Sequence, residues 1–212
     1  MPTVHLADRS LLHVRGADAV TFLQGLVTTD VAALAKGEAR PGALLSPQGK
    51  ILFSFLVLAD GDTVALDCAT GDAPALLKRL TLYKLRSSVE LSVEDQMVNS
   101  VSWDDGPDSS HSDSTTSHGE SSRFLDRSYP FAVTRSHGAG VPAATAGPEA
   151  LDRLRIIHAI AEPGRDFANG EAFPHDVNLD QTGGVSFRKG CYVGQEVVSR
   201  MQHRGTARRR AV

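Results

Sequence analysis

The sequence predicts an α+β protein in which mixed or antiparallel sheets and flanking helices form two lobes. Strand-like and helix-like apolar patterns alternate through the first hundred residues. Neighbouring strands are joined by short turns, and not only by long crossovers, which favours antiparallel pairing. The chain of 212 residues, 41% hydrophobic and 22% charged, is also long enough to bury a substantial core.

The first lobe is expected over residues 1–103. An apolar stripe at 17–26 predicts a helix, and Asp72 with Pro74 predicts the start of a second helix, which ends near Arg86. A cluster of turn residues between two apolar runs predicts a hairpin with strands at 43–45 and 51–59. The other strands are expected at 3–14, 63–68, 89–93 and 96–103, and the last two are expected to pair.

Residues 104–122 are rich in Ser, Asp, His and Gly and poor in apolar side chains, so we expect a flexible polar loop there. The second lobe is expected over residues 123–203, with a helix at 148–161 that a Pro-Gly pair ends. Residues 204–212 are expected to be a tail or the start of a further, shortened domain.

The formal net charge of −3 gives no general reason to expect a nucleic-acid partner. Arginines at positions 200, 204 and 208–210 make the end of the chain basic. We interpret them as a solvated surface, with an anion-binding or RNA-binding tail as the alternative. The sequence shows no signal-peptide pattern and no apolar run of membrane-spanning length, so we expect a cytoplasmic protein without a membrane partner.

The chain has two cysteines, Cys68 and Cys191, which lie far apart in the sequence. Two cysteines cannot form a disulfide framework or supply a four-thiolate iron–sulfur site, and no Cys/His cluster has metal-ligand spacing. Cys68 ends an apolar strand and is expected to point into the core as a small hydrophobic side chain.

Cys191 stands in the run KGCYVGQE, which covers residues 189–196. The glycines at 190 and 194 allow unusual backbone conformations and the close approach of a ligand. The cations at 188 and 189 favour the thiolate, which is the reactive form of cysteine. A structural turn whose cysteine fills a gap is the alternative, and the residue chemistry alone leaves both interpretations open.

This run, with FPHDVNLD before it and VVSRMQHRG after it, resembles the signature of the YgfZ family. The stretches LADRSLLHVRGADAVTFLQGLVTTDV and LLSPQGKILFSFLVL resemble the opening of the same family, so the similarity spans most of the chain. Members of this family bind tetrahydrofolate, support iron–sulfur enzymes and are related to the glycine-cleavage T-protein, an aminomethyltransferase. The resemblance implies the folate-binding fold of the T-protein, with a C-terminal β-barrel that would begin about where this chain stops.

The resemblance also implies a tetrahydrofolate site around Asp176, which stands where the related T-proteins carry an acidic residue facing the pteridine. A loop-capping role is the alternative for this aspartate. Folate further needs apolar walls and a cation for its glutamate tail. We expect Cys191 to be the functional centre, and the further cofactor-binding candidates are Phe173, Arg188, Tyr192, Gln195, Glu196 and Arg200.

Three functions follow as hypotheses. The first is a tetrahydrofolate-binding accessory protein for assembly or repair of iron–sulfur clusters, with client or assembly proteins as partners. The second is a folate-dependent aminomethyl transferase. Related transferases carry an aspartate after the glycine-rich hairpin turn, whereas this chain has Phe53 and Ser54, neither of which can accept the proton, which argues against conventional transfer. The third is an interaction module that uses the basic tail.

Overall fold

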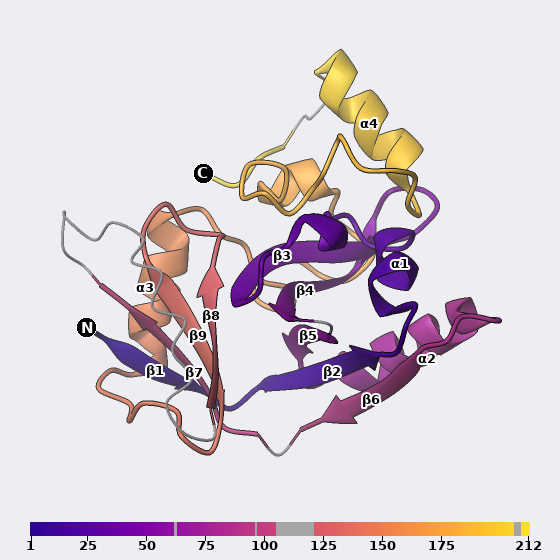
Figure 1. The fold of residues 1–212 in the computed structure, drawn as a ribbon. Coiled ribbons are helices and arrows are strands. Elements are labelled where there is room, and N and C mark those ends of the chain that lie inside the picture. The colour runs from indigo at the N-terminus through magenta and orange to yellow at the C-terminus, as the bar shows by residue number, and fades with distance from the viewer. Residues whose placement is uncertain (62, 96, 105–120, 206–208) are drawn as a thin grey trace.

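Nine strands form one mixed sheet in the part of the chain that the structure describes (Figure 1). The structure is a computed structural model, and it describes residues 1–61, 63–95, 97–104, 121–205 and 209–212. The strands are β1 Thr3–Leu6, β2 Arg9–Arg15, β3 Glu38–Leu45, β4 Ile51–Asp60, β5 Thr63–Ala69, β6 Glu90–Glu94, β7 Asn99–Trp103, β8 Ser121–Asp126 and β9 Val133–Gly138. The helices are α1 Ala19–Gln24, α2 Ala73–Lys84, α3 Pro148–Ile157 and α4 Gln195–Arg204, with short 3-10 turns η1 Val31–Ala33 and η2 Pro174–Val177.

The strand order is β1-β7-β9-β8-β3-β4-β5-β2-β6. Strands β3 and β8 run parallel and the other neighbours run antiparallel, so the sheet is mixed. Figure 1 shows two groups of strands, with α3 beside β1, β7 and β9 and with α1 and α2 beside the group from β3 to β6. The predicted α+β class with a mixed sheet is therefore confirmed.

The expected pairing of the two strands near residues 90 and 100 is wrong. Strand β6 pairs with β2, and β7 pairs with β1 and β9. The reason is that the two strands belong to different cores. Leu91 and Val93 of β6 pack against the cluster under α1 and α2, whereas Val101 and Trp103 of β7 belong to the cluster under α3.

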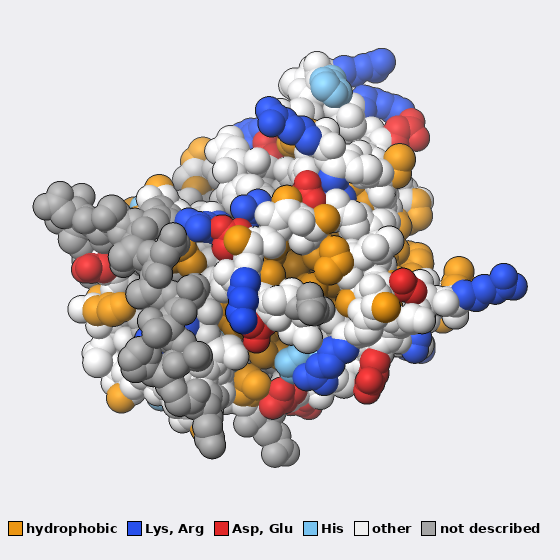
Figure 2. Space-filling model, in the orientation of Figure 1, with side chains coloured by type: hydrophobic (Ala, Val, Ile, Leu, Met, Phe, Trp, Pro, Cys, Tyr) orange, Lys and Arg blue, Asp and Glu red, His pale blue; other side chains and the backbone are white. Residues whose placement is uncertain are grey.

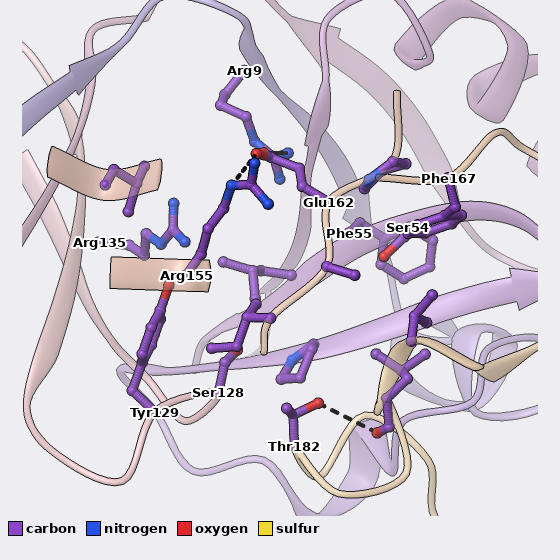
Figure 3. Close-up of a pocket in the computed structure, with 18 of the residues that line it drawn as sticks. Arg9, Ser54, Phe55, Ser128, Tyr129, Arg135, Arg155, Glu162, Phe167 and Thr182 are labelled. Carbon is purple, nitrogen blue, oxygen red and sulfur yellow. Dashed lines mark hydrogen bonds and ion pairs between the residues drawn. The ribbon is translucent and has the colours of Figure 1, made fainter. Parts of the chain in front are cut away.

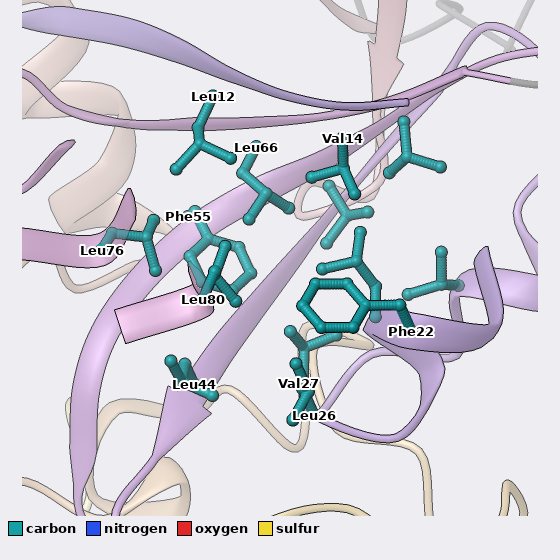
Figure 4. Close-up of a cluster of buried hydrophobic side chains, with 14 of the residues drawn as sticks. Leu12, Val14, Phe22, Leu26, Val27, Leu44, Phe55, Leu66, Leu76 and Leu80 are labelled. Atoms are coloured by element: carbon teal, nitrogen blue, oxygen red, sulfur yellow. The ribbon is translucent and has the colours of Figure 1, made fainter. Parts of the chain in front are cut away.

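The largest apolar cluster fills the space between α1, α2 and strands β2, β4 and β5 (Figure 4). Leu76 and Leu80 lie one helical turn apart on α2 and are fully buried against the sheet. Phe55 of β4 faces this cluster, while the next residue, Leu56, faces a separate cluster on the other side of the sheet. Because successive strand residues point to opposite faces, β4 needs apolar residues at nearly every position.

A buried polar network joins the two groups of strands. The Arg9 guanidinium donates from Nε to Asp67 Oδ1 at 2.7 Å, and both side chains are almost fully buried. The Asn99 side chain donates to the Arg9 carbonyl at 2.9 Å and contacts His137 Nδ1 at 2.8 Å. Since Arg9 and Asp67 lie on β2 and β5, and Asn99 and His137 on β7 and β9, the network connects strands that share no ladder.

This network determines the ionisation of Asp67. Burial alone would raise the pKa of its carboxyl, but the charges of Arg9 and Arg135 outweigh burial, so that the pKa lies below its ordinary value. In His137, burial dominates and lowers the pKa, so the imidazole is neutral at neutral pH.

The described part of the C-terminal tail packs against η2. The Arg210 guanidinium donates to Asp180 at 2.9 and 3.1 Å, and the backbone N–H of Ala211 donates to the carbonyl of Asp176 at 3.0 Å. Residues 206–208 lie outside the described residues, as do residues 105–120 of the expected polar loop. The division of the chain into two lobes stays a prediction.

No helix in the described ranges has the length and apolar character that crossing a bilayer requires.

We expect Asp67→Asn to destabilise the fold by about 3–5 kcal/mol, because it leaves the buried Arg9 guanidinium without its counter-charge. The native carboxyl has a pKa below its ordinary value of 3.8, so its stabilising contribution is full above that value and is lost as the pH falls through the lower native pKa. Urea unfolding from neutral to acidic pH should show a constant difference between wild type and variant that shrinks only below about pH 4.

The control is Asp60→Asn, which changes an exposed carboxylate in a 3.6 Å ion pair with the exposed Lys36. Its effect should stay within about 0.5 kcal/mol. An Asp67→Asn protein as stable as this control would contradict the assigned role of the buried pair.

Candidate functional site

The segment that leads to Cys191 is held against the loop that follows α1. Thr28 donates from Oγ1 to the Gly184 carbonyl at 2.6 Å, and the N–H of Ser186 donates to the Thr28 carbonyl at 2.9 Å. The Lys189 ammonium donates to the carbonyls of Val27 and Thr29 at 2.7 and 2.8 Å. Two motifs more than 150 residues apart in sequence therefore form one structural unit.

Lys189 acts in this structure as the anchor of that unit. Its ammonium lies 5.1 Å from the centre of the Tyr192 ring, and burial lowers its pKa to about 8. Tyr192 is itself buried in an apolar cluster with Leu45, Ile51 and Val198. The cation that we expected to favour a thiolate at position 191 is therefore engaged with backbone carbonyls.

Gly194 lets the segment turn into α4 while touching the β3–β4 hairpin. Its φ of +79° is in the left-handed region, and an added Cβ would lie 2.5 Å from the Ser46 carbonyl oxygen. Gly49, at the tip of that hairpin, is equally close to α4, because an added Cβ would lie 2.9 Å from Val197. By contrast, a Cβ at Gly190 would meet nothing within 4 Å.

The two cysteines lie in opposite environments. Cys68 is buried as predicted, its thiol donates to the Ser10 carbonyl, and burial raises its pKa to about 12. Cys191 is exposed. An exposed thiol on a firmly held segment can be reached by a large partner, whereas the Cys68 thiol cannot.

A pocket lies between the two groups of strands (Figure 3). Its cavity volume is about 90 Å³, and one water molecule needs roughly 10–15 Å³ on the same measure. In Figure 3, Arg9, Arg135 and Arg155 lie on one side, while Phe55 and Phe167 lie on the other. The pocket thus has a charged end and an aromatic end.

The charged end carries a single carboxylate among its lining residues, that of Glu162. Its oxygens lie 3.7 Å from the Arg9 guanidinium and 3.8 Å from that of Arg155, which is beyond hydrogen-bond distance. Arg155 makes its closest contacts with Asp152 and Asp166 instead. Burial alone would lower the pKa of Arg155, but these carboxylates raise it above its ordinary value.

Glu162 and Phe167 reach the pocket from one tight turn. The N–H of Glu162 donates to Asp166 Oδ2 at 2.8 Å, and the N–H of Gly164 donates to the Phe167 carbonyl at 2.9 Å. Gly164 has a φ of +79°, which a glycine adopts without strain. The turn therefore presents a carboxylate and an aromatic ring to the same space.

Asp176 makes a local hydrogen bond in this structure. Its Oδ2 accepts from the N–H of Phe173 at 2.9 Å, at the start of η2, as the loop-capping alternative predicts. The Phe173 ring lies under the Lys50 ammonium, 3.6 Å from the ring centre. Neither residue is part of the pocket lining.

The remaining cofactor-binding candidates also lie outside that lining. Gln195 and Glu196 begin α4, and Glu196 forms an exposed ion pair with Arg200 at 2.6 Å. Arg188 is exposed and borders a separate surface hollow with Asp30 and other residues. The binding roles of these residues, and of Tyr192, stay predictions.

Sequence reasoning missed the residues that form the pocket, including Arg9, Arg135, Arg155, Glu162 and Phe167. Glu162 and Phe167 come from one turn, and the other residues come from different strands and helices. None of them stands in a local sequence motif that indicates a binding site. The one local signal was the Pro-Gly pair after Glu162, which we had interpreted only as the end of a helix.

Among the residues that the structure describes, no group of three or more His, Cys, Asp or Glu side chains is arranged to hold a metal ion.

No family model matches the chain. Comparison with solved structures gives the glycine cleavage system aminomethyltransferase T from Bartonella henselae, with a TM-score of 0.70 over 95% of this chain and 63% of that one, at 16% identity. The chain has the aminomethyltransferase fold. This similarity confirms the fold expected from the resemblance. Because the sequence identity is so low, it shows nothing about function.

Comparison by sequence finds proteins named iron–sulfur cluster assembly factor IBA57 homolog, mitochondrial. The relative from Chaetomium globosum is 32% identical over 98% of this chain and 54% of its own length. The relative from Pyricularia oryzae is 32% identical over 97% of this chain and 55% of its own length. The chain with the aminomethyltransferase fold thus spans about half the length of the relatives it matches.

The expected cytoplasmic location is contradicted by these relatives, which are named as mitochondrial proteins. The expectation rested on the lack of a secretory signal and of a disulfide framework. Those features do not distinguish the cytoplasm from another reducing compartment, which is why the inference failed.

We expect Gly194→Ala to destabilise the protein by about 2–4 kcal/mol, because alanine is strained at positive φ and its Cβ would collide with the hairpin backbone. Gly190→Ala should change stability by less than about 0.5 kcal/mol, since its Cβ meets open space. Urea denaturation of the two variants measures the contrast. Equal effects would mean that the packing of the Cys191 segment differs from that described.

Proposed function

We propose that this protein is a tetrahydrofolate-binding accessory protein for the assembly or repair of iron–sulfur clusters. The observation that carries the proposal is the 32% identity, over 98% of the chain, to a protein named as an iron–sulfur cluster assembly factor. The partners that follow are iron–sulfur assembly or client proteins, together with a reduced folate.

The central pocket is the place in this structure whose chemistry fits a folate. A pteridine is flat and carries adjacent N–H donors on one edge, so it needs aromatic or apolar walls and a carboxylate. Phe55 and Phe167 supply the walls and Glu162 the carboxylate. The cavity of about 90 Å³ would enclose only part of the pteridine, and the rest of a folate would lie toward the mouth of the pocket.

In this arrangement Glu162 accepts hydrogen bonds from the pteridine edge. A bound reduced folate would supply a carrier for one-carbon units. The residues of the chain bind it, orient it and exclude water from its flat faces.

Cys191 has a separate role in this proposal. Its thiol is exposed and lies outside the pocket lining, so it is accessible to a protein partner. A thiolate in that place can attack a disulfide of a partner, forming a mixed disulfide and releasing one of the partner's thiols, or it can contact the iron of a partner's cluster.

The aminomethyltransferase fold favours a second candidate, a folate-dependent aminomethyl transferase. Ser54 lines the pocket on β4, in the part of the chain where the related transferases carry an acid. Serine cannot take the proton at neutral pH that this role requires. Formation of methylenetetrahydrofolate from an aminomethyl-lipoyl donor would favour this candidate over the accessory role.

Calorimetric titration with tetrahydrofolate tests the pocket. Wild type should bind saturably, and Glu162→Gln should weaken binding by about tenfold to a hundredfold, because it replaces a charged acceptor at the pteridine edge. Cys191→Ala should bind like wild type. Glu171→Gln, which changes an exposed carboxylate outside the pocket, is the matched control.

The titration also decides between the pocket and the sequence-based site. Loss of binding in Asp176→Ala with full binding in Glu162→Gln would indicate that the folate binds at the loop around η2 and not in the pocket. Absence of binding in wild type would remove folate from the proposal.

A rescue experiment tests the role of the thiol. In a strain that lacks its own related assembly factor, wild type should restore the activity of iron–sulfur enzymes and Cys191→Ala should not. Cys68→Ala is the matched control, since it removes the buried thiol and should rescue like wild type. Full rescue by Cys191→Ala would exclude the thiol from the mechanism, and no rescue by wild type would contradict the assembly role.

A further inference from the structure

The end of α2 presents two leucines to solvent. Leu82 is 64% exposed and Leu85, the residue after the helix, is 89% exposed. Leu82 lies on the face of α2 that points away from Leu76 and Leu80, which are fully buried. The core therefore does not need Leu82 and Leu85, and two large apolar side chains at one exposed tip call for another explanation.

The same tip is positively charged. Helix α2 contains no acidic residue, and Lys78 and Arg79 lie one helical turn before Leu82, so they share its face. Lys84 and Arg86 flank Leu85 on both sides. The acidic residues near the tip are Asp18, whose carboxylate accepts a hydrogen bond from the Ser88 N–H at 2.7 Å, and Glu90, at the start of β6.

The tip is convex. In Figure 1 the turn between α2 and β6 is the outermost part of the molecule on the right, and Figure 2 shows hydrophobic side chains beside protruding Lys or Arg side chains there. Leu85 has a φ of +43°, a conformation that leucine rarely adopts. Val89, which follows in the same turn, is buried and anchors the turn to the core. The backbone thus holds Leu85 outward.

We propose that this tip, Leu82 and Leu85 with their rim of Lys78, Arg79, Lys84 and Arg86, docks onto an anionic membrane surface. Two leucines offer far less apolar area than the roughly 800 Å² per partner of a stable protein interface. A lipid surface needs no matching pocket, since protruding apolar side chains insert between its lipids. Its anionic headgroups attract the surrounding basic side chains.

Peripheral docking is a different property from membrane spanning. The expectation of no membrane partner rested on apolar runs too short to cross a bilayer, and the described helices agree with that argument. The tip would lie at the level of the lipid headgroups while the sheet and the pocket stay in water.

Vesicle flotation with the whole chain tests the proposal. The protein should float with vesicles of phosphatidylcholine and phosphatidylglycerol but not with phosphatidylcholine alone, and high salt should weaken binding. The double variant Leu82→Ser/Leu85→Ser should bind about a hundredfold more weakly, because burial of each leucine is worth about tenfold in affinity. Lys78→Gln/Arg79→Gln should weaken binding by about tenfold.

The matched control is Ile156→Ser/Ile157→Ser, which changes two side chains on α3 that are 62% and 70% exposed but lie among charges of both signs. It should bind like wild type, and circular dichroism should show that all three double variants are folded. Three results would overturn the proposal. These are no binding by wild type at low salt, binding that does not depend on the leucines, and leucine-dependent binding to an acidic polypeptide without binding to vesicles.

Discussion

The buried ion pair between Arg9 and Asp67 is the interaction on which the arrangement of the pocket depends. Arg9 uses Nε and one terminal nitrogen on Asp67, and its other terminal nitrogen faces Glu162 at 3.7 Å. One side chain therefore holds a strand pair together and also lines the pocket. Removing one partner of a buried pair leaves an uncompensated charge, so a substitution of Arg9 would alter the pocket lining and also destabilise the fold. A ligand that enters meets charges whose positions are fixed in advance, which lowers the reorganisation that binding requires.

A second constraint acts on the thiol. The Lys189 ammonium is bound to two carbonyls of the loop after α1, and Gly194 touches the turn between β3 and β4. Both contacts hold the backbone on either side of Cys191, while Gly190 next to it has open space. The basic residue and the glycine thus fix the segment and leave the thiol free of packing. The same sequence pattern suggested an activated thiolate, but the structure supports positioning as the function of Lys189.

The sequence was informative where the signal is local. Periodicity of two or of 3.6 and the turn residues identify hairpins and helices, since these depend on neighbouring residues. The pocket has no such signal, because Arg9, Ser54, Arg135 and Arg155 lie on four different elements and meet only after the sheet has formed. The partner of β6 was mispredicted for the same reason. Asp176 was inferred from resemblance alone; in the structure its carboxylate accepts a local hydrogen bond, and its binding role stays a prediction.

The separation between thiol and pocket bears on which chemistry the chain can perform. Covalent transfer to a bound folate requires the reacting groups within about 3–3.5 Å of each other. Cys191 is exposed and does not line the pocket, and Ser54 on β4 cannot itself take a proton at neutral pH. A single active centre that combines thiol and folate is therefore not what this geometry favours. Two surfaces, the pocket that we propose for a flat ligand and a thiol that a large partner can approach, fit a protein that acts on another protein better than one that turns over a small substrate alone.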